Sequence, residues 1–473
     1  MKERIKSVVL VVLIIMNFIL GSRVLSTKKL WSDDGYNFFA NTANNSITGI
    51  IRSIKKHLGG SRVQSETHLE SPEIIIINTG YQTSRLALNR SDEEFMQLSE
   101  LLNEFLISAF SSQGFVSVRA DDFYSALTAK SIYLRYPVDY DSSLFAYLLG
   151  VSGADFSQSF TQLRNIVVSA DGSVFVEDSA SASFYRCATG LSTQELNSAI
   201  DAHISDDDGQ ASVINYAFDL GFDKSFGNQK AILSPMIPIY SDELQVETIR
   251  AQSPVTASDD VLNEPFINDI LRLFNMKLNV LRRHTEVDGT VVFVENNSIL
   301  KISPSGIIDY TAKENGVLLS KNNYTTQSGA VSAIAGFVDS VNNAVGADAM
   351  MQLSSKLTTS ELSGTAFTVT LDYLANGLPV SIKNSDFENA VTVNIDNGRI
   401  TRYRHILRSY TPTARLSTVS NYINALDEAI ARYQNQLNEI EISTMEVVYY
   451  DDCTDGEKLP AWDVGVKEIV IGD

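Results

Sequence analysis

The longest apolar run of the chain lies close to its N-terminus. Residues 8–20 are apolar except for Asn17, and three basic residues precede them, Lys2, Arg4 and Lys6. An α-helix over the 16 residues from Ser7 to Ser22 would span about 24 Å, which is short of a hydrocarbon core of about 30 Å. No small-residue cleavage pattern follows the run. We therefore predict an uncleaved transmembrane anchor with a cytoplasmic N-terminus and the bulk of the chain outside the cytoplasm, since long domains translocate largely regardless of flanking charge.

One face of this predicted helix carries its polar residue. Asn17 and Gly21 are one turn apart, and three apolar residues continue the same stripe, Leu10, Ile14 and Val24. Such a face can bind another transmembrane helix, because Gly21 allows close approach and the Asn17 amide contributes about 1 kcal/mol by hydrogen bonding across the interface. The alternative is that Asn17 lies near the outer interface and is simply hydrated, which costs little. The stripe is our predicted partner-binding face.

Beyond residue 70 the pattern becomes one of short strands and amphipathic helices. Four isoleucines at 74–77 predict a strand, and the periodicity of residues 91–108 predicts a helix. Later, three helices at 259–274, 330–345 and 417–433 each precede antiparallel strands. The fold class is thus predicted to be α+β, with a transmembrane helix followed by several extracytoplasmic domains of helices packed on antiparallel sheets. The predicted domains are a tip and anchor at 1–30, an N-terminal domain at 31–160, a middle domain at 161–257 and a C-terminal domain at 258–473.

Two hairpin signals resemble each other. Asp171-Gly-Ser-Val-Phe-Val and Asp288-Gly-Thr-Val-Val-Phe-Val both place Asp-Gly before an apolar strand. They indicate either duplicated units in the middle and C-terminal regions or two unrelated hairpins with the same turn chemistry.

The charge and cysteine content of the chain limit which classes of partner and covalent link we expect. The formal charge is −20 over 473 residues, and so acidic a surface is repelled by nucleic-acid phosphates and by anionic lipid headgroups. We predict no nucleic-acid binding. The two cysteines, Cys187 and Cys453, could form one long-range disulfide or stay free and buried; the second is favoured because lone cysteines are among the most buried residue types.

Signatures of catalysis are missing from the sequence. It contains no G-x-S-x-G, H-E-x-x-H, P-loop or C-x-x-C motif, and its five histidines are scattered. His284 follows two arginines, which is typical of a solvated basic face. The run Asp206-Asp207-Asp208-Gly209 lacks the first and twelfth ligands of a calcium loop and is interpreted as an acidic turn. We predict a non-enzyme with no catalytic residues, cofactor or metal. A secreted hydrolase using a carboxylate pair is a weaker alternative.

Several local patterns together resemble the YycH family of two-component-system regulators. They follow one another along nearly the whole chain: Lys29-Leu-Trp, Gly35-Tyr-Asn-Phe-Phe39, Lys130-Ser-Ile-Tyr-Leu-Arg-Tyr-Pro137, Asp288-Gly-Thr-Val-Val-Phe-Val-Glu295, Leu300-Lys-Ile-Ser-Pro-Ser-Gly306, Asp372-Tyr-Leu-Ala-Asn-Gly-Leu-Pro-Val380 and Leu459-Pro-Ala-Trp462. Each is a structural signature rather than a catalytic motif.

The resemblance implies a specific role. Members of the family sit in the cytoplasmic membrane of Gram-positive bacteria with their bulk outside, fold as three domains, and act with a smaller membrane-anchored partner, YycI. Together they modulate the sensor histidine kinase WalK (YycG), which governs cell-wall turnover, largely through transmembrane helices. The predicted function is therefore a non-catalytic accessory protein of such a kinase. The alternative is an extracytoplasmic module that binds a peptide or cell-wall fragment, which would work without its anchor.

Overall fold

The computed structural model describes residues 69–468, apart from residues 81–84, 113, 152–159, 204–213, 227–230, 241–242, 256–263, 296, 315, 320–326, 348, 355–365, 384–386 and 434–439. The predicted anchor and the acidic run at 206–209 lie outside the described residues. Within the described part of the chain, no helix is long and apolar enough to cross a membrane.

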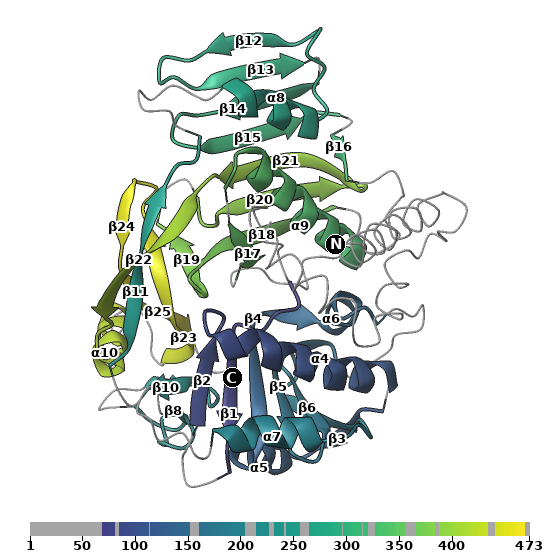
Figure 1. Ribbon diagram of the computed structural model, residues 1–473, viewed down its shortest axis with the longest axis vertical. Coiled ribbons are helices and arrows are strands. Elements are labelled where there is room, and N and C mark those ends of the chain that lie inside the picture. Colours follow the sequence, from purple (N-terminus) through teal and green to yellow (C-terminus); the bar gives the residue numbers. More distant parts are fainter. Residues whose placement is uncertain are drawn as a thin grey trace, which may run out of the picture. The chain divides into compact units, whose positions relative to one another are not determined.

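The first sheet has seven antiparallel strands (Figure 1). Its order is β2-β1-β4-β5-β6-β7-β3, with β1 (Ile74–Asn78), β2 (Arg85–Asn89), β3 (Val116–Val118), β4 (Ser131–Asp141), β5 (Gln162–Ser169), β6 (Ser173–Asp178) and β7 (Ser183–Ala188). Because β4 pairs with β5, the domain boundary that we predicted at residue 160 runs through this sheet. The sequence signal there was a change of pattern between neighbouring strands, which does not reveal that they pair.

Helices cover both faces of this sheet. Ile75 and Ile77 belong to one buried cluster with residues of α4 (Glu93–Ser112) and α7 (Gln194–Ala202). Ile74 and Ile76 belong to another cluster with residues of α5 (Ala120–Thr128). A strand buried on both faces needs apolar side chains at every position, and this explains why β1 is an uninterrupted run of isoleucine rather than an alternating strand.

The C-terminal half builds a thirteen-stranded sheet. Its main path is β12-β13-β14-β15-β21-β20-β18-β19-β23-β25, and β16, β17 and β9 pair at its sides. The strands are β9 (Ala231–Leu233), β12 (Arg282–Thr285), β13 (Val291–Glu295), β14 (Ser298–Ile302), β15 (Ile307–Ala312), β16 (Val317–Leu318), β17 (Met350–Leu353), β18 (Ala366–Ala375), β19 (Leu378–Ile382), β20 (Val391–Asp396), β21 (Arg399–Ile406), β23 (Ile440–Asp451) and β25 (Pro460–Glu468).

Three helices pack on this second sheet. Phe274 follows α8 (Glu264–Leu273), and its ring centroid lies 4.7 Å from that of Tyr310 in β15. The ring centroid of Phe337 in α9 (Gln327–Ala344) lies 5.5 Å from that of Tyr403 in β21. Leu426 and Ile430 of α10 (Tyr422–Tyr433) are buried with residues of β23. The helix predicted from residue 417 starts later because residues 417 and 418 still pair with β11.

Two smaller sheets accompany the two large ones. One joins β22 (Ser409–Thr418), β11 (Gln245–Gln252) and β24 (Gly456–Lys458), and another joins β10 (Pro238–Tyr240) and β8 (Ile214–Tyr216). The short helix α6 (Ser142–Leu148) contacts α9. The α+β class predicted for the chain beyond the anchor is confirmed by these helices and mostly antiparallel sheets, whereas the predicted transmembrane helix stays a prediction.

Both Asp-Gly hairpins form as predicted. The Asp171 carboxylate accepts from the Ser173 amide at 2.9 Å, and the Asp288 carboxylate accepts from the Thr290 amide at 3.0 Å. The following glycines have φ of +78° and +85°, a region that favours glycine because it has no Cβ. The two cysteines are thiols that do not form a disulfide with each other; Cys187 is buried and Cys453 is partly exposed.

His405 is fully buried and satisfied by two tyrosines. The Tyr403 hydroxyl lies 2.8 Å from Nδ1 and the Tyr373 hydroxyl lies 2.7 Å from Nε2. Tyr373 also donates to the Ile406 carbonyl at 2.9 Å, so a neutral ring that donates from Nε2 and accepts at Nδ1 satisfies the whole network. Burial lowers the pKa of His405 to about 3. This histidine is therefore a structural residue of the core.

A buried ion pair fixes the end of β23. The Arg408 Nε atom lies 2.9 Å from Asp451 Oδ2, and the two side chains are 1% and 0% exposed. Arg408 also reaches Asp455 at 2.8 Å, and the Tyr410 hydroxyl donates to Asp451 at 2.9 Å. The interaction joins the start of β22 to the loop between β23 and β24.

Replacing Arg408 by methionine tests this pair. The change leaves the Asp451 carboxylate buried with its main counter-charge removed, and we expect it to lower the free energy of unfolding by about 3–5 kcal/mol. Arg432→Met is the control, because Arg432 pairs with Glu428 at 4.0 Å on the exposed face of α10 and such pairs contribute less than about 1 kcal/mol. Urea denaturation measures both; equal effects would contradict the assignment.

Candidate functional site

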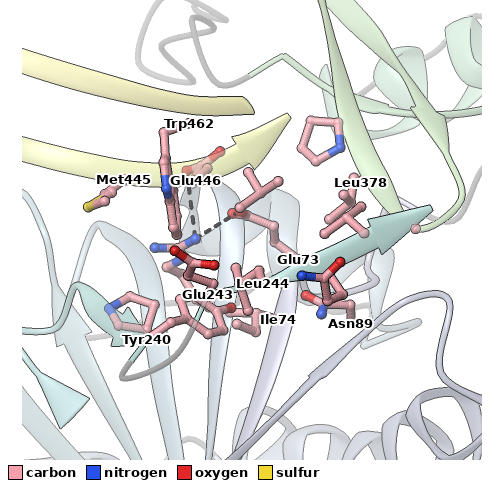
Figure 2. A pocket seen from close by; sticks show the side chains of 17 residues that line it. Glu73, Ile74, Asn89, Tyr240, Glu243, Leu244, Leu378, Met445, Glu446 and Trp462 are labelled. Carbon is pink, nitrogen blue, oxygen red and sulfur yellow. Dashed lines mark hydrogen bonds and ion pairs between the residues drawn. The ribbon is translucent and has the colours of Figure 1, made fainter. Parts of the chain in front are cut away.

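A pocket of about 400 Å³ opens where the first sheet meets the strands of the C-terminal half. Its wall combines β1 and β4, the segment between β10 and β11, the β18–β19 turn, and β23 with β25 (Figure 2). The charged lining is Glu73, Arg135, Glu243 and Glu446; the aromatic lining is Tyr240 and Trp462; the remaining lining is largely apolar, with Ile74, Leu244, Val246, Leu378, Pro379, Met445 and Val447.

A bulge in the first sheet brings two arginines to one side of this pocket. The pairing of β4 with β5 shifts between Arg135 and Tyr140, where Pro137 removes a backbone donor from the ladder. Opposite the bulge, Arg164 donates from Nε to the Tyr136 carbonyl at 2.9 Å. Bulges re-aim side chains in this way, and here both guanidiniums are directed to a carboxylate of β23.

That carboxylate is Glu446. Its Oε1 atom lies 3.3 Å from Arg164 Nη2 and 3.8 Å from Arg135 Nη2. On the other side, Arg135 Nη2 donates to Glu73 Oε1 at 2.8 Å, with both side chains 8% exposed. Figure 2 shows Glu73 and Glu446 joined to one guanidinium by dashed lines. Two carboxylates and two guanidiniums are thus gathered in one buried cluster.

Hydrogen bonding within this cluster is incomplete. Among the described residues, Glu73 Oε2 and Arg135 Nε are buried without a hydrogen-bond partner. A buried polar atom without a partner costs about 1–3 kcal/mol. Such atoms are uncommon in native proteins, and each one needs an explanation such as strain or a missing ligand.

Burial also shifts the acid–base properties of the cluster. Desolvation, reinforced by the nearby Glu73 carboxylate, raises the pKa of Glu446 to about 7, although Arg135 and Arg164 oppose the shift. Burial works against the charge of Arg135, but Glu73 and Glu446 outweigh it, so the pKa of the guanidinium is raised. Arg135 therefore stays charged, whereas Glu446 changes its charge close to neutral pH.

The pocket wall at the β18–β19 turn is held by a close backbone contact. Gly377 has a φ of +76°, and a Cβ atom there would lie 3.0 Å from the carbonyl carbon of Arg90 and closer still to the Ser91 amide. The Arg90 guanidinium donates to the Ser71 carbonyl at 2.8 Å and to Gln352 Oε1 at 2.5 Å. The segment 372–380, which resembles the YycH family, therefore contains a glycine that is required where the turn contacts the backbone just before α4.

The chemistry available in this pocket is that of recognition. It offers carboxylates beside fixed guanidiniums, two aromatic rings and an apolar floor, which is typical of ligand pockets with a few placed polar groups. Within the described residues, no group of three or more histidine, cysteine, aspartate or glutamate side chains could hold a metal ion.

The predicted partner-binding residues Leu10, Ile14, Asn17, Gly21 and Val24 lie outside the described residues, so their grouping stays a prediction. The sequence analysis missed Glu73, Arg135 and Glu446. The signal that could have found them is a charged residue inside a strand whose neighbours are all buried, as for Arg135 in β4 and Glu446 in β23. Such a charge needs a counter-charge nearby.

Comparison with known proteins places the fold. No family model matches the sequence, and no curated protein matches it. Among solved structures, the crystal structure of YycH from Bacillus subtilis aligns with a TM-score of 0.56 at 9% sequence identity, covering 86% of this chain and 98% of that chain. An uncharacterized protein from Eubacterium rectale aligns with a TM-score of 0.30 at 11% identity, over 52% of this chain and 86% of that one. The protein therefore has a YycH-like fold, as the resemblance implied.

Two alanine substitutions test the close contact at the turn. Gly377 and Gly398 each follow an asparagine in a tight hairpin, with φ of +76° and +71°, but only Gly377 has atoms within 4 Å of its virtual Cβ. Gly398→Ala should lower the free energy of unfolding by about 1–2 kcal/mol, the cost of placing a Cβ atom at positive φ. Gly377→Ala should lower it by at least about 1 kcal/mol more, because its Cβ would also clash with the neighbouring backbone. Chemical denaturation measures both, and equal losses would show that the turn does not press on the backbone of Arg90 and Ser91.

The pH dependence of stability tests Glu446. Its pKa is higher in the folded protein than the ordinary 4.5, so the stability from its protonation is complete below pH 4.5 and is lost as the pH rises through about 7. Glutamine cannot titrate. The free energy of unfolding of Glu446→Gln relative to the native chain should therefore rise by about 1–3 kcal/mol between pH 5 and pH 8.

Urea denaturation at several pH values gives this difference. Glu428→Gln is the control, because Glu428 is 75% exposed on α10, and its difference from the native chain should not change over that range. A constant difference for Glu446→Gln would mean that folding does not raise the pKa of the Glu446 carboxyl group.

Proposed function

We propose that this protein is a non-catalytic accessory protein that modulates a sensor histidine kinase controlling cell-wall turnover. It would be held in the cell membrane by its N-terminal helix, with the N-terminus in the cytoplasm and the folded part outside. The observation that carries the proposal is the likeness of fold to YycH, which extends over 98% of that chain. The ordered sequence motifs of the same family support it independently.

Contact with the kinase is assigned to the anchor. The stripe of Leu10, Ile14, Asn17, Gly21 and Val24 would pack against a transmembrane helix of a WalK-like kinase, and a YycI-like protein would act beside it. Regulation requires that the stripe bind two packings of the kinase helices with different affinity, because a partner with equal affinity for both states shifts nothing.

The folded part would supply the input. The pocket joins strands from the first sheet to strands of the C-terminal sheet, so a ligand bound there contacts elements that are distant in sequence. This pocket also favours the second candidate function, an extracytoplasmic module that binds a peptide or wall fragment without any kinase. The two functions differ in whether the anchor is needed.

Crosslinking in intact membranes tests the anchor. We expect the native chain to capture a sensor kinase, and a chain with residues 7–25 replaced by polyleucine to capture none, because polyleucine lacks the Asn17 amide and the small Gly21. Asn17→Leu should weaken capture by about fivefold, equivalent to about 1 kcal/mol. Phe18→Leu is its control, since in the predicted helix residue 18 would be about 100° away from residue 17 around the axis.

Mass spectrometry identifies the captured proteins. Capture that survives the polyleucine replacement would assign the contact to the folded part. Absence of a kinase with either chain would reject the regulator and leave the binding module.

A further inference from the structure

The charge of the pocket is not balanced by its own residues. Five acidic or basic side chains line the pocket or contact its lining: the carboxylates of Glu73, Glu243 and Glu446 and the guanidiniums of Arg135 and Arg164. With all five ionised, the carboxylates are one in excess. Both guanidiniums already contact Glu446, and Arg135 also pairs with Glu73, so their positive charge is matched by carboxylates of the protein even though the N–H of Arg135 Nε has no acceptor among the described residues.

The unmatched carboxylate oxygen lies in a residue of the pocket wall. Glu73 lines the pocket, its side chain is more than nine-tenths buried, and its Oε2 has no hydrogen-bond partner among the described residues. A carboxylate withdrawn from water is stable only when a cation or several donors compensate it. A positively charged ligand group would supply the compensation that this wall lacks.

Two aromatic rings stand beside the carboxylates. The centroids of Tyr240 and Trp462 are 6.0 Å apart, with an interplanar angle of 47°, and Figure 2 shows both at the side of the pocket where Glu243 and Glu446 lie. Aromatic faces attract cations through the ring quadrupole. The apolar side chains of Ile74, Leu244 and Met445 suit a hydrocarbon stem rather than a hydroxylated ring.

We propose that this pocket binds an aliphatic ammonium, that is, a cationic amine carried on an apolar stem, as at the end of a lysine side chain or of a free diamine. The ammonium lies among the carboxylates of Glu73, Glu243 and Glu446, and the stem lies against the apolar wall. The inference rests on the proposed function only for its signalling consequence. Binding itself is measured without a kinase.

Binding is coupled to proton release. Glu446 of β23 faces Glu73, which directly precedes β1, and also Arg135 of β4, Arg164 of β5 and Asp463 of β25. An added cation favours the ionised form of Glu446, because opposite charge within a few ångströms stabilises a carboxylate. The complex therefore holds fewer protons than the free protein, and affinity rises with pH between about 6 and 8.

Matched probes test the charge requirement on the full-length chain in detergent micelles. Nα-acetyl-L-lysine amide carries the ammonium, and Nα-acetyl-L-norleucine amide has a similar stem without it. By isothermal titration calorimetry at pH 8, we expect the lysine probe to bind at least about tenfold more tightly, as charge-assisted hydrogen bonds do. A third probe, 1,5-diaminopentane, distinguishes a free diamine from a peptide side chain as the source, since the tighter of the two cationic probes identifies it.

Three variants locate the binding. Glu73→Gln should lower the affinity for the lysine probe by about tenfold or more. Because that change also removes the partner of Arg135, the exposed rim residue Glu243 provides a second variant that leaves the buried cluster intact. Glu243→Gln should lower the affinity for the lysine probe by about two- to fivefold. Glu428→Gln, on the exposed face of α10, should change nothing.

The proton linkage provides a separate measurement. Titrations at pH 7 in buffers of different ionisation enthalpy should show release of a fraction of a proton with the native chain and none with Glu446→Gln. Equal affinity for the lysine and norleucine probes, or no binding of either cationic probe, would overturn the proposal. If the probes bind but no kinase is captured in the membrane, the pocket assignment stands and the regulatory function fails; the reverse result rejects the pocket alone.

Discussion

Desolvation of charge is the constraint on which this structure depends. Arg135 of β4 and Glu73, the residue before β1, are both withdrawn from water. Glu446 reaches them from a strand more than 300 positions further along the chain. Burying isolated charges costs several kcal/mol each, and their mutual attraction offsets this only when the geometry holds. The cluster therefore favours one relative placement of β1, β4 and β23, because separating them would leave buried charges without their counter-charges. The pocket exists because these three strands meet there.

Much of the fold could be predicted from the sequence where the pattern is local. The Asp-Gly turns at 171–172 and 288–289 form as predicted, because an aspartate that accepts from the amide two residues on and a glycine with positive φ are sufficient for the turn. The helices at 330–345 and 417–433 exist with shifted ends. Their apolar periodicity was visible, whereas the start of α10 depends on the pairing of β22 with β11, which is a contact across the chain.

The site could not be predicted in this way. Nothing in the residues near Arg135 shows that its partners are Glu73 and Glu446, because these carboxylates come from positions 62 residues before and 311 residues after it. The sequence does show that Arg135 stands within an apolar strand and must be compensated somewhere. The pairing of β4 with β5 across the predicted boundary at residue 160 was missed for the same reason: antiparallel register is set by contacts between segments, and each segment alone reads as an ordinary strand.

Strand β23 limits the kinds of movement that the folded part can make. It runs antiparallel to β25 and parallel to β19 and β9, while Glu446 near its middle and Asp451 at its end are both held by arginines. Because side chains alternate between faces, sliding this strand by one residue would turn both carboxylates to the wrong side of the sheet. A shift of β23 by one residue along its own axis is thus unfavourable. Motion started at the pocket can spread through β23 only as a tilt or rotation of the strand as a rigid lever, in which a small angle at one end becomes a larger displacement at the other.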